Sequence, residues 1–187
     1  MTLDEIRIRI DQTDTQMKPL FLSRMECAGQ VAETKKQNGG EVFVASREQA
    51  ILDARTADVN PEIRGEYTAF LRHLIGLSRR YQYGILTDMQ EKSVAEALSR
   101  AGLDPKTPHN QVEVRFTCGK ENAGLPVLME AISLNGIPIR RLLMEASDGP
   151  QTVTLLLEGS LKKPHMKQLL CQLIKETADF QIVALEE

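Results

Sequence analysis

The sequence predicts two domains of different fold class, an all-α domain of three helices followed by an α+β domain with the element order βαββαβ. Two observations carry this prediction. Apolar residues recur at helical spacing in the first half, whereas alternating stretches typical of strands dominate the second half. We expect the helical domain over residues 1–90, a helix and a linker with two prolines over 91–109, and the α+β domain over 110–187.

The composition excludes several classes of protein. The chain of 187 residues has a formal net charge of −3, so it lacks the basic excess of nucleic-acid-binding proteins, and we expect no nucleic-acid partner. It shows neither a signal-peptide core nor an apolar run of membrane-spanning length, so we expect no membrane partner. Three cysteines without a CxxC pair exclude a disulfide framework and predict a cytoplasmic location.

The first predicted element is one long helix over residues 3–37. Ile10, Met17 and Val31 recur on one stripe, and the Asn-Gly-Gly sequence at 38–40 ends the pattern. At about 1.5 Å per residue this helix is about 50 Å long, more than the width of a small domain. A partner must therefore cover its stripe. Pro19 lies inside the helix and removes one backbone hydrogen bond.

Two further helices complete the predicted N-terminal domain. The sequence Ser-Arg-Glu-Gln at 46–49 has the form of a capping box and predicts a helix over 46–57. Asn60 and Pro61 have the residue types of a helix cap and a first helical position, which predicts a third helix up to about Leu86. Three helices of such unequal length do not enclose a core alone. We expect a homodimer, or a higher even homo-oligomer, that exchanges its long helices.

The second half carries strand patterns separated by two helical segments. The expected strands are 112–116, 137–146, 152–157 and 180–185, and the expected helices are 125–135 and 164–178. This βαββαβ order is that of the ferredoxin-like fold. A short helix over 93–101 precedes the linker at 102–108.

Polar side chains replace apolar ones on the inward stripes of the helical domain. Arg24 lies within the apolar stripe of the first helix, and Lys35, eleven residues later, points in nearly the same direction. Ser78 and Gln82 lie one turn apart on the inner stripe of the third helix. Burying unpaired cations costs several kcal/mol, so the set predicts a pocket for a small polyanion. The alternative is that these residues form salt bridges or hydrogen bonds along a dimer seam.

Arg7 adds a geometric constraint to this pocket. It precedes Arg24 by 17 residues, which is about 25 Å along a helix axis. Both side chains cannot reach one small ligand from the same copy. If Arg7 belongs to the site, it must come from a second, antiparallel subunit.

The polar residues and their spacing resemble a known family over about residues 1–86. The pattern comprises Leu3, Ile6, Arg7, Ile10, Asp11, Asp14, Arg24, Lys35, Arg47, Glu48, Ser78 and Gln82. It resembles the all-helical, intertwined dimeric class of chorismate mutase. The resemblance implies an enzyme of aromatic amino acid biosynthesis that converts chorismate to prephenate by a concerted Claisen rearrangement without a cofactor. The protein then contributes positioning and electrostatic stabilisation.

The resemblance also implies roles for residues at the two carboxylates of chorismate. By the family's pattern, Arg24 and Arg7 of the partner subunit grip the carboxylates, Ser78 helps to fix one of them, and Arg47 supports this electrostatically. Pro19 interrupts the helix between the two arginines, and it can shift how they converge.

At the ether oxygen and the ring hydroxyl the resemblance implies a second group of residues. Lys35 and Gln82 donate to the ether oxygen, and Glu48 binds the hydroxyl. Val44 stands where the family often has an aspartate, so it offers only its backbone. Arg47 and Glu48 have an alternative role as ordinary first-turn residues of a capped helix.

The C-terminal half resembles the ACT-type regulatory domain. Its first strand and helix are joined by a glycine-containing loop, and the helix N-terminus offers backbone N–H groups to a carboxylate. We take Asn122, Ala123, Gly124 and Leu125 as candidate effector-binding residues, and Phe or Tyr as the expected effector. The alternative is an ordinary turn between a strand and a helix.

Two other functions fit the same sequence. One is a non-catalytic amino-acid sensor whose helical half serves only for dimerisation. The other is an isochorismate pyruvate lyase on the same scaffold. His73, His109 and His165 are dispersed without ligand spacing, so we expect no metal.

Overall fold

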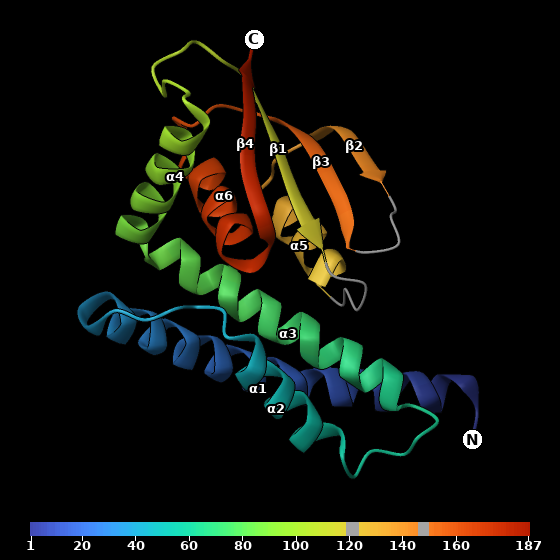
Figure 1. Ribbon diagram of the computed structural model, residues 1–187. Helices are drawn as coiled ribbons and strands as arrows, with labels where there is room; N and C mark the ends of the chain where they lie inside the picture. Colours follow the sequence, from blue (N-terminus) through green and yellow to red (C-terminus); the bar gives the residue numbers. More distant parts are fainter. Residues whose placement is uncertain (119–123, 146–149) are drawn as a thin grey trace.

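The computed structural model describes residues 1–118, 124–145 and 150–187. It confirms a helical N-terminal region and a C-terminal region with four antiparallel strands and helices (Figure 1). The elements are α1 (Leu3–Asn38), α2 (Ala45–Thr56), α3 (Arg64–Ile85), α4 (Thr87–Ala101), β1 (Gln111–Cys118), α5 (Gly124–Leu134), β2 (Ile139–Glu145), β3 (Gln151–Glu158), α6 (Pro164–Glu176) and β4 (Ala178–Glu186). In these ranges no helix is both long and apolar enough to cross a bilayer.

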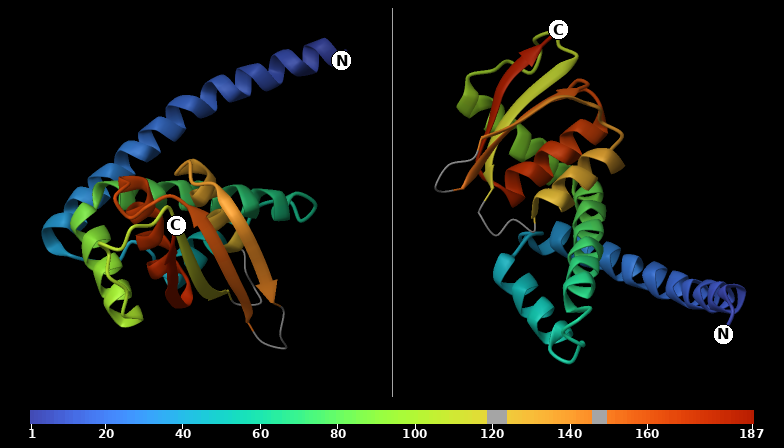
Figure 2. Two further views of the ribbon diagram at one scale, coloured as in Figure 1. Left: turned by 90° about the horizontal axis from the view of Figure 1, so that it is seen from above. Right: turned by 90° about the vertical axis from the view of Figure 1, so that its right-hand side faces the viewer.

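Helix α1 forms as one element of 36 residues and continues through Pro19. Thr2 and Glu5 form a capping box at its start. At its end Gly39 takes a φ of 77°, which favours glycine, and its N–H donates to the carbonyl oxygen of Lys35 at 2.8 Å. The N-terminal half of α1 projects away from the rest of the chain (Figure 2). Among the described residues of this copy, none therefore covers the apolar stripe near the N-terminus.

The predicted capping box at 46–49 is wrong. Helix α2 begins at Ala45, with Val44 as its N-cap residue and no side-chain cap. The N–H of Glu48 already donates to the carbonyl oxygen of Val44 at 3.1 Å, so helical hydrogen bonding begins before Ser46. The side chain of Gln49 donates to Asp53 at 2.7 Å, one turn further along the helix.

The predicted start of the third helix at Asn60 is also wrong. The side-chain oxygen of Asn60 accepts from the N–H of Glu62 at 3.0 Å, and its carbonyl oxygen accepts from Ile63 at 3.1 Å. Asparagine therefore stabilises a turn here. Helix α3 begins only at Arg64.

Helix α4 starts six residues before the predicted helix over 93–101, and Leu86 alone separates it from α3. Val94, Ala97 and Leu98 of α4 pack into the main hydrophobic core. The N–H of Gly102, in the left-handed conformation, closes the helix. This helix therefore packs as part of the C-terminal core, directly continuous with the helical half.

The four strands form one antiparallel sheet in the order β2-β3-β1-β4. Helices α5 and α6 cover one of its faces, where Val114, Phe116 and Leu155 pack against Leu169 and Leu173. On the opposite face Arg115 is exposed to solvent. Alternating burial along β1 follows from the period of two in a strand.

Helix α3 is the element that joins the two halves, because it packs against α1 and α2 on one side and against α5 and α6 on the other. A Cβ atom at Gly76 would clash with the side chain of Val127 on α5, so glycine permits this close approach. A small buried cluster of Val42, Tyr83 and Cys171 lies at the same junction. The position of α3 thus depends on both halves of the chain.

Candidate active site

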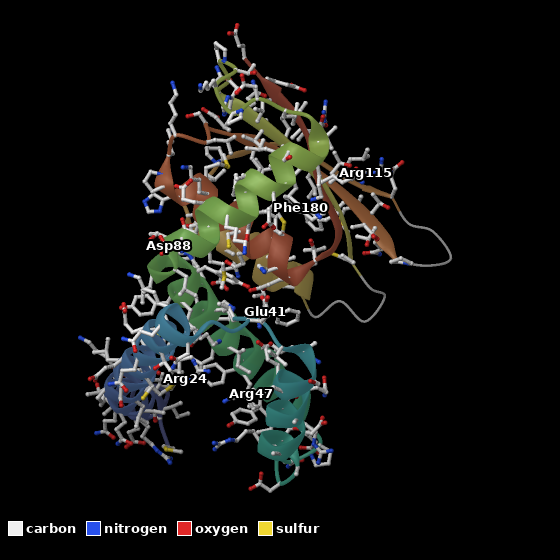
Figure 3. The ribbon with its side chains drawn as sticks, turned by 60° about the vertical axis from the view of Figure 1, so that its left-hand side comes forward. Arg24, Glu41, Arg47, Asp88, Arg115 and Phe180 are labelled. Atoms are coloured by element: carbon white, nitrogen blue, oxygen red, sulfur yellow. The ribbon has the colours of Figure 1, made fainter. Side chains whose placement is uncertain are left out.

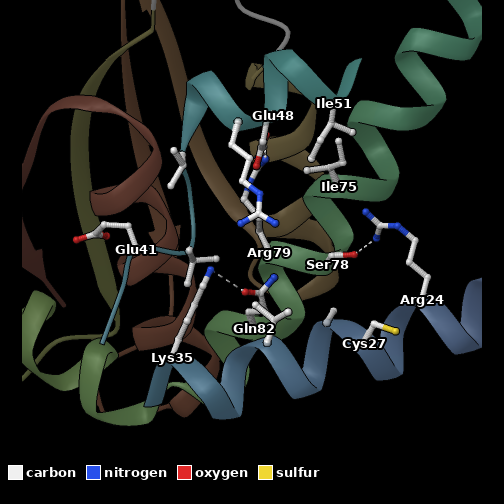
Figure 4. A pocket seen from close by; sticks show the side chains of 15 residues that line it. Arg24, Cys27, Lys35, Glu41, Glu48, Ile51, Ile75, Ser78, Arg79 and Gln82 are labelled. Carbon is white, nitrogen blue, oxygen red and sulfur yellow. Dashed lines mark hydrogen bonds and ion pairs between the residues drawn. The ribbon is translucent and has the colours of Figure 1, made fainter. Parts of the chain in front are cut away.

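One pocket of about 300 Å³ lies between α1, α2 and α3, and all the predicted substrate residues except Arg7 line it (Figure 4). These residues are Arg24, Lys35, Val44, Arg47, Glu48, Ser78 and Gln82. Figure 3 shows Arg24 on α1 and Arg47 on α2 in the helical part of the molecule. The structure therefore brings together side chains that lie up to 58 positions apart in the chain.

Arg24 is held against α3 by two hydrogen bonds. One terminal nitrogen of its guanidinium donates to the carbonyl oxygen of Leu74 at 3.1 Å and to the hydroxyl of Ser78. The Ser78 hydroxyl also donates to the Leu74 carbonyl oxygen at 3.1 Å. Burial lowers the pKa of Arg24. Ser78 thus orients Arg24, while the other guanidinium nitrogens remain available toward the pocket.

Lys35 and Gln82 form the second polar pair of the pocket. The Lys35 ammonium donates to the side-chain oxygen of Gln82 at 3.2 Å. Because this bond uses the amide oxygen of Gln82, the amide nitrogen remains as a donor. Burial lowers the pKa of Lys35, and the positive charge of Arg47 lowers it further. Two cations therefore share a small volume and raise its positive potential.

Arg24, Lys35 and Arg47 form no ion pair with any carboxylate in the part of the chain that the structure describes. Salt bridges were one alternative explanation for Arg24 and Lys35, and in this copy no ion pair accounts for them. The hydrogen bonds of that alternative are present within the copy, from Arg24 to Ser78 and from Lys35 to Gln82.

Glu41 and Glu48 line the same pocket, and their charges act to raise the pKa of Lys35, but neither is paired with these three cations. Three cations that lack an ion pair around one pocket favour an anionic ligand.

Much of the remaining wall is apolar. It includes Ala28, Val42, Ile51 and Ile75, which come from the three helices and the α1–α2 connection. Apolar walls with a few directed polar groups are typical of sites for small organic molecules. The pocket is therefore suited to a small organic anion with an apolar ring or chain.

Arg79 is the residue of this site that sequence reasoning missed. It donates to Glu48 in the pocket and, through two nitrogens at 2.8 and 2.9 Å, to both carboxylate oxygens of Glu176 on α6. The ring of Phe43 lies under the guanidinium carbon at 4.9 Å. A signal existed, because Arg79 lies four residues after Ile75 and three before Gln82 on the inward stripe.

Arg7 lies outside the pocket of its own copy. Its side chain is 66% exposed and pairs with Asp4 at 3.2 Å on the surface of α1. This position agrees with the geometric argument that Arg7 and Arg24 cannot meet within one copy. Its contribution to the pocket of a second subunit stays a prediction.

The carbonyl oxygen of Val44 accepts the first hydrogen bond of α2, from the N–H of Glu48. Val44 lines the pocket with its side chain 43% exposed. Recognition of a ligand by its backbone stays a prediction.

The candidate effector residues are only partly described. Asn122 and Ala123 lie outside the described residues. Gly124 begins α5, and Leu125 is half-buried and packs against the main core. Their role as an effector site stays a prediction.

Comparison with known proteins gave one match, to part of the chain. Residues 6–83 match a family described as chorismate mutase type II. This segment contains all of α2, nearly all of α1 and α3, and every predicted substrate residue. Searches of curated proteins and of solved structures gave no match. The family match supports chorismate mutase activity for this segment. Chorismate mutase is an intramolecular isomerase of aromatic amino acid biosynthesis.

Proposed function

We propose that this protein converts chorismate to prephenate as a homodimer, with the pocket between α1, α2 and α3 as its active site. The observation that carries the proposal is the set of three cations around one small pocket, Arg24, Lys35 and Arg47, which form no ion pair with any described residue. Chorismate is a dianion with a ring, an ether oxygen and a hydroxyl. A cationic pocket with an apolar wall matches each of these features.

Arg24 and Arg7 of the partner subunit bind the two carboxylates in this proposal. The bond from Arg24 to Ser78 holds the guanidinium in place before substrate arrives. Because Arg24 is already ordered, binding costs little of its side-chain entropy, and the fixed cation can hold the substrate in its compact, chair-like shape. Arg47 adds positive potential without a hydrogen-bond partner of its own among the described residues.

Lys35 and Gln82 act where charge develops. The rearrangement breaks a C–O bond, and negative charge grows on the ether oxygen in the transition state. The ammonium of Lys35 and the free amide nitrogen of Gln82 stabilise that charge, since their mutual bond at 3.2 Å aims both into the pocket. Glu48 accepts a hydrogen bond from the ring hydroxyl, and Val44 contributes backbone contact. No proton transfer and no cofactor are required.

The homodimer is supported by the surface of α1. Its apolar residues Leu3, Ile10, Met17 and Leu20, which share one face of the helix, are 45–71% exposed. A contiguous apolar stripe of this kind marks an interaction surface. An antiparallel second copy of α1 covers the stripe and brings Arg7 of the partner subunit toward Arg24. A higher even oligomer is compatible with the same contact.

The C-terminal domain serves in this proposal as an ACT-like regulatory domain with the ferredoxin-like fold. The antiparallel strand order β2-β3-β1-β4, with both helices on one face, supports it. The effector is an amino acid, Phe or Tyr, bound near the start of α5. A cytoplasmic location, expected from the cysteine content, accompanies this proposal.

The test is the consumption of chorismate by the purified protein without a cofactor, with prephenate as the product. Arg24→Ala should lower kcat/KM at least about a hundredfold, because a preorganised cation is lost, while the circular dichroism spectrum stays unchanged. Lys36→Ala is the matched control, since Lys36 is exposed on the same helix and does not line the pocket.

Other outcomes separate the rival functions. Release of pyruvate from isochorismate, with no turnover of chorismate, identifies a lyase. Binding of Phe or Tyr by calorimetry in a well-folded protein without turnover identifies a sensor. If neither amino acid changes the rate, the thermal stability or the oligomer size, the regulatory proposal fails while the enzyme proposal stands.

A further inference from the structure

A buried group of three charged residues lies between the pocket and the C-terminal domain. Arg79 on α3 is 8% exposed, Glu176 at the end of α6 is 3% exposed, and Glu48 on α2 is 20% exposed. The group connects three helices, and its outer members come from the two different halves of the chain. Charged residues are rarely this buried unless they are paired.

The nitrogens of the Arg79 guanidinium bind two different glutamates. Two of its nitrogens donate to both oxygens of Glu176, which fixes the plane of the guanidinium. The third nitrogen donates to one oxygen of Glu48. The Phe43 ring supports the same plane from one face. The direction in which Arg79 holds Glu48 is therefore set by Glu176.

Glu48 has one carboxylate oxygen occupied by Arg79 and one without a donor among the described residues. Glu48 and Arg79 line the active-site pocket, and both also line a second cavity of about 240 Å³. Glu176, Val127 and Leu128 of the C-terminal domain line one part of that second cavity. The Glu48–Arg79 pair thus forms a wall between the substrate pocket and the C-terminal domain.

We propose that Arg79 is a positioning residue through which Glu176 of the C-terminal domain holds the carboxylate of Glu48 in the orientation that receives the substrate's ring hydroxyl. The inference rests on the proposed function, because the role of Glu48 belongs to it. It adds that recognition of the hydroxyl depends on a residue of the second domain, outside the segment matched by the family model.

A comparison of kcat/KM for two substrates measures what Arg79 and Glu176 contribute. One is chorismate, and the other is the analogue that lacks the ring hydroxyl. Glu48→Gln should lower kcat/KM for chorismate by about tenfold or more and leave the analogue nearly unchanged, because only chorismate uses the carboxylate. Glu176→Gln should give a smaller loss with the same selectivity. The double variant should lose no more than Glu48→Gln alone.

Two further variants separate positioning from stability. Arg79→Lys keeps the charge but removes the planar, two-nitrogen contact, so it should fold and lose discrimination as Glu176→Gln does. Glu91→Gln is the control, because Glu91 pairs with Lys167 across α4 and α6 at 2.6 Å, away from both cavities. It should leave both substrates unaffected.

An equal loss with both substrates, or losses of Glu48→Gln and Glu176→Gln that multiply in the double variant, overturns the proposal. A crystal structure of Glu176→Gln provides a readout independent of turnover, in which Glu48 should leave its position on Arg79. If the wild-type protein does not turn over chorismate, the proposed function fails. The displacement of Glu48 then still decides whether Glu176 positions it.

Discussion

At the scale of single residues, the pocket brings together three cations that form no ion pair with any described residue, although two glutamates also line it. Burial lowers the pKa of Lys35 first, and the charge of Arg47 adds to this. A bound dianion counteracts the second effect, because its charge favours the protonated lysine. Arg79 shows the opposite pattern. Burial lowers its pKa, but the charges and hydrogen bonds of Glu176 and Glu48 outweigh this and raise it. Arg79 is thus fully paired with two glutamates, whereas Lys35 has a hydrogen bond to Gln82 but no ion pair among the described residues, so its charge is available to a ligand.

Cys171 gives a prediction about stability and pH. Burial at the junction of the two halves raises the pKa of its thiol from 9.0 to about 11. As the pH rises, the thiol therefore loses its proton in the unfolded chain before it does in the folded protein. The contribution of the buried neutral thiol to the free energy of unfolding is complete below pH 9 and is lost as the pH rises through about 11. We expect the free energy of unfolding to fall by up to about 1.4 kcal/mol per pH unit across this window.

Denaturant unfolding under reducing conditions, at about pH 8 and about pH 10, measures this fall. Cys171→Ala should reduce the slope of stability against pH, whatever its effect on stability at neutral pH. Cys27→Ala should keep the wild-type slope, since Cys27 is exposed. If wild type and Cys171→Ala show the same slope of stability against pH, the Cys171 thiol is not the source of the fall.

At the scale of the elements, helix α3 makes contacts on two of its faces, one with the pocket and one with α5. Its inner face presents Ser78 and Gln82 to the pocket, and Gly76 lies against Val127 of α5 on another face. The position of the pocket's hydrogen-bond donors relative to the C-terminal domain therefore depends on how closely α3 and α5 approach.

Two alanine substitutions in α3 test this contact. Gly76→Ala should destabilise the protein by about 1–3 kcal/mol, because its Cβ forces Val127 to move. Gly65→Ala in the same helix meets no atom within 4 Å, so it should be neutral or stabilise by up to about 1 kcal/mol. Thermal unfolding of both variants measures the difference. Equal midpoints would show that the α3–α5 contact relaxes without cost.

The elements also show what the sequence could predict. Helix α1 and the order of strands and helices follow from the period of the apolar residues. Four pocket residues follow from polar side chains on the inward stripes, and Val44, Arg47 and Glu48 follow from the resemblance.

The predicted starts of α2 and α3 were wrong because Ser46 and Asn60 have residue types that often cap helices but do not cap these two. Ser46 lies inside α2, and Asn60 stabilises a turn before α3. The bond between Arg79 and Glu176 joins residues 97 positions apart, which no local pattern can predict.

At the scale of the whole molecule, the proposed dimer adds Arg7 of the partner subunit to a pocket that one copy forms without its own Arg7. Only Ala28 and Ala32 of α1 are buried, and Arg7 lies on the surface. The proposed dimer predicts complementation between variants. Arg7→Ala and Arg24→Ala homodimers should each be nearly inactive, because every pocket lacks one arginine. In a mixed dimer, one pocket receives both arginines and the other receives neither.

Coexpression or joint refolding of the two variants should therefore restore about a quarter of the wild-type activity, since about half of the dimers are mixed and each has one intact pocket. Refolding either variant with itself is the control. If mixing restores nothing although both variants dimerise, Arg7 does not act across the subunit boundary.

The junction at Leu86 has a practical consequence. Since α3 passes almost without a break into α4, whose residues Val94, Ala97 and Leu98 lie in the C-terminal core, the catalytic half has no natural end at residue 86. A fragment cut there would expose Tyr83 and lose Glu176, two groups that are inaccessible in the whole chain. Anyone who wishes to study the N-terminal segment alone should expect to redesign its surface before it can be expressed.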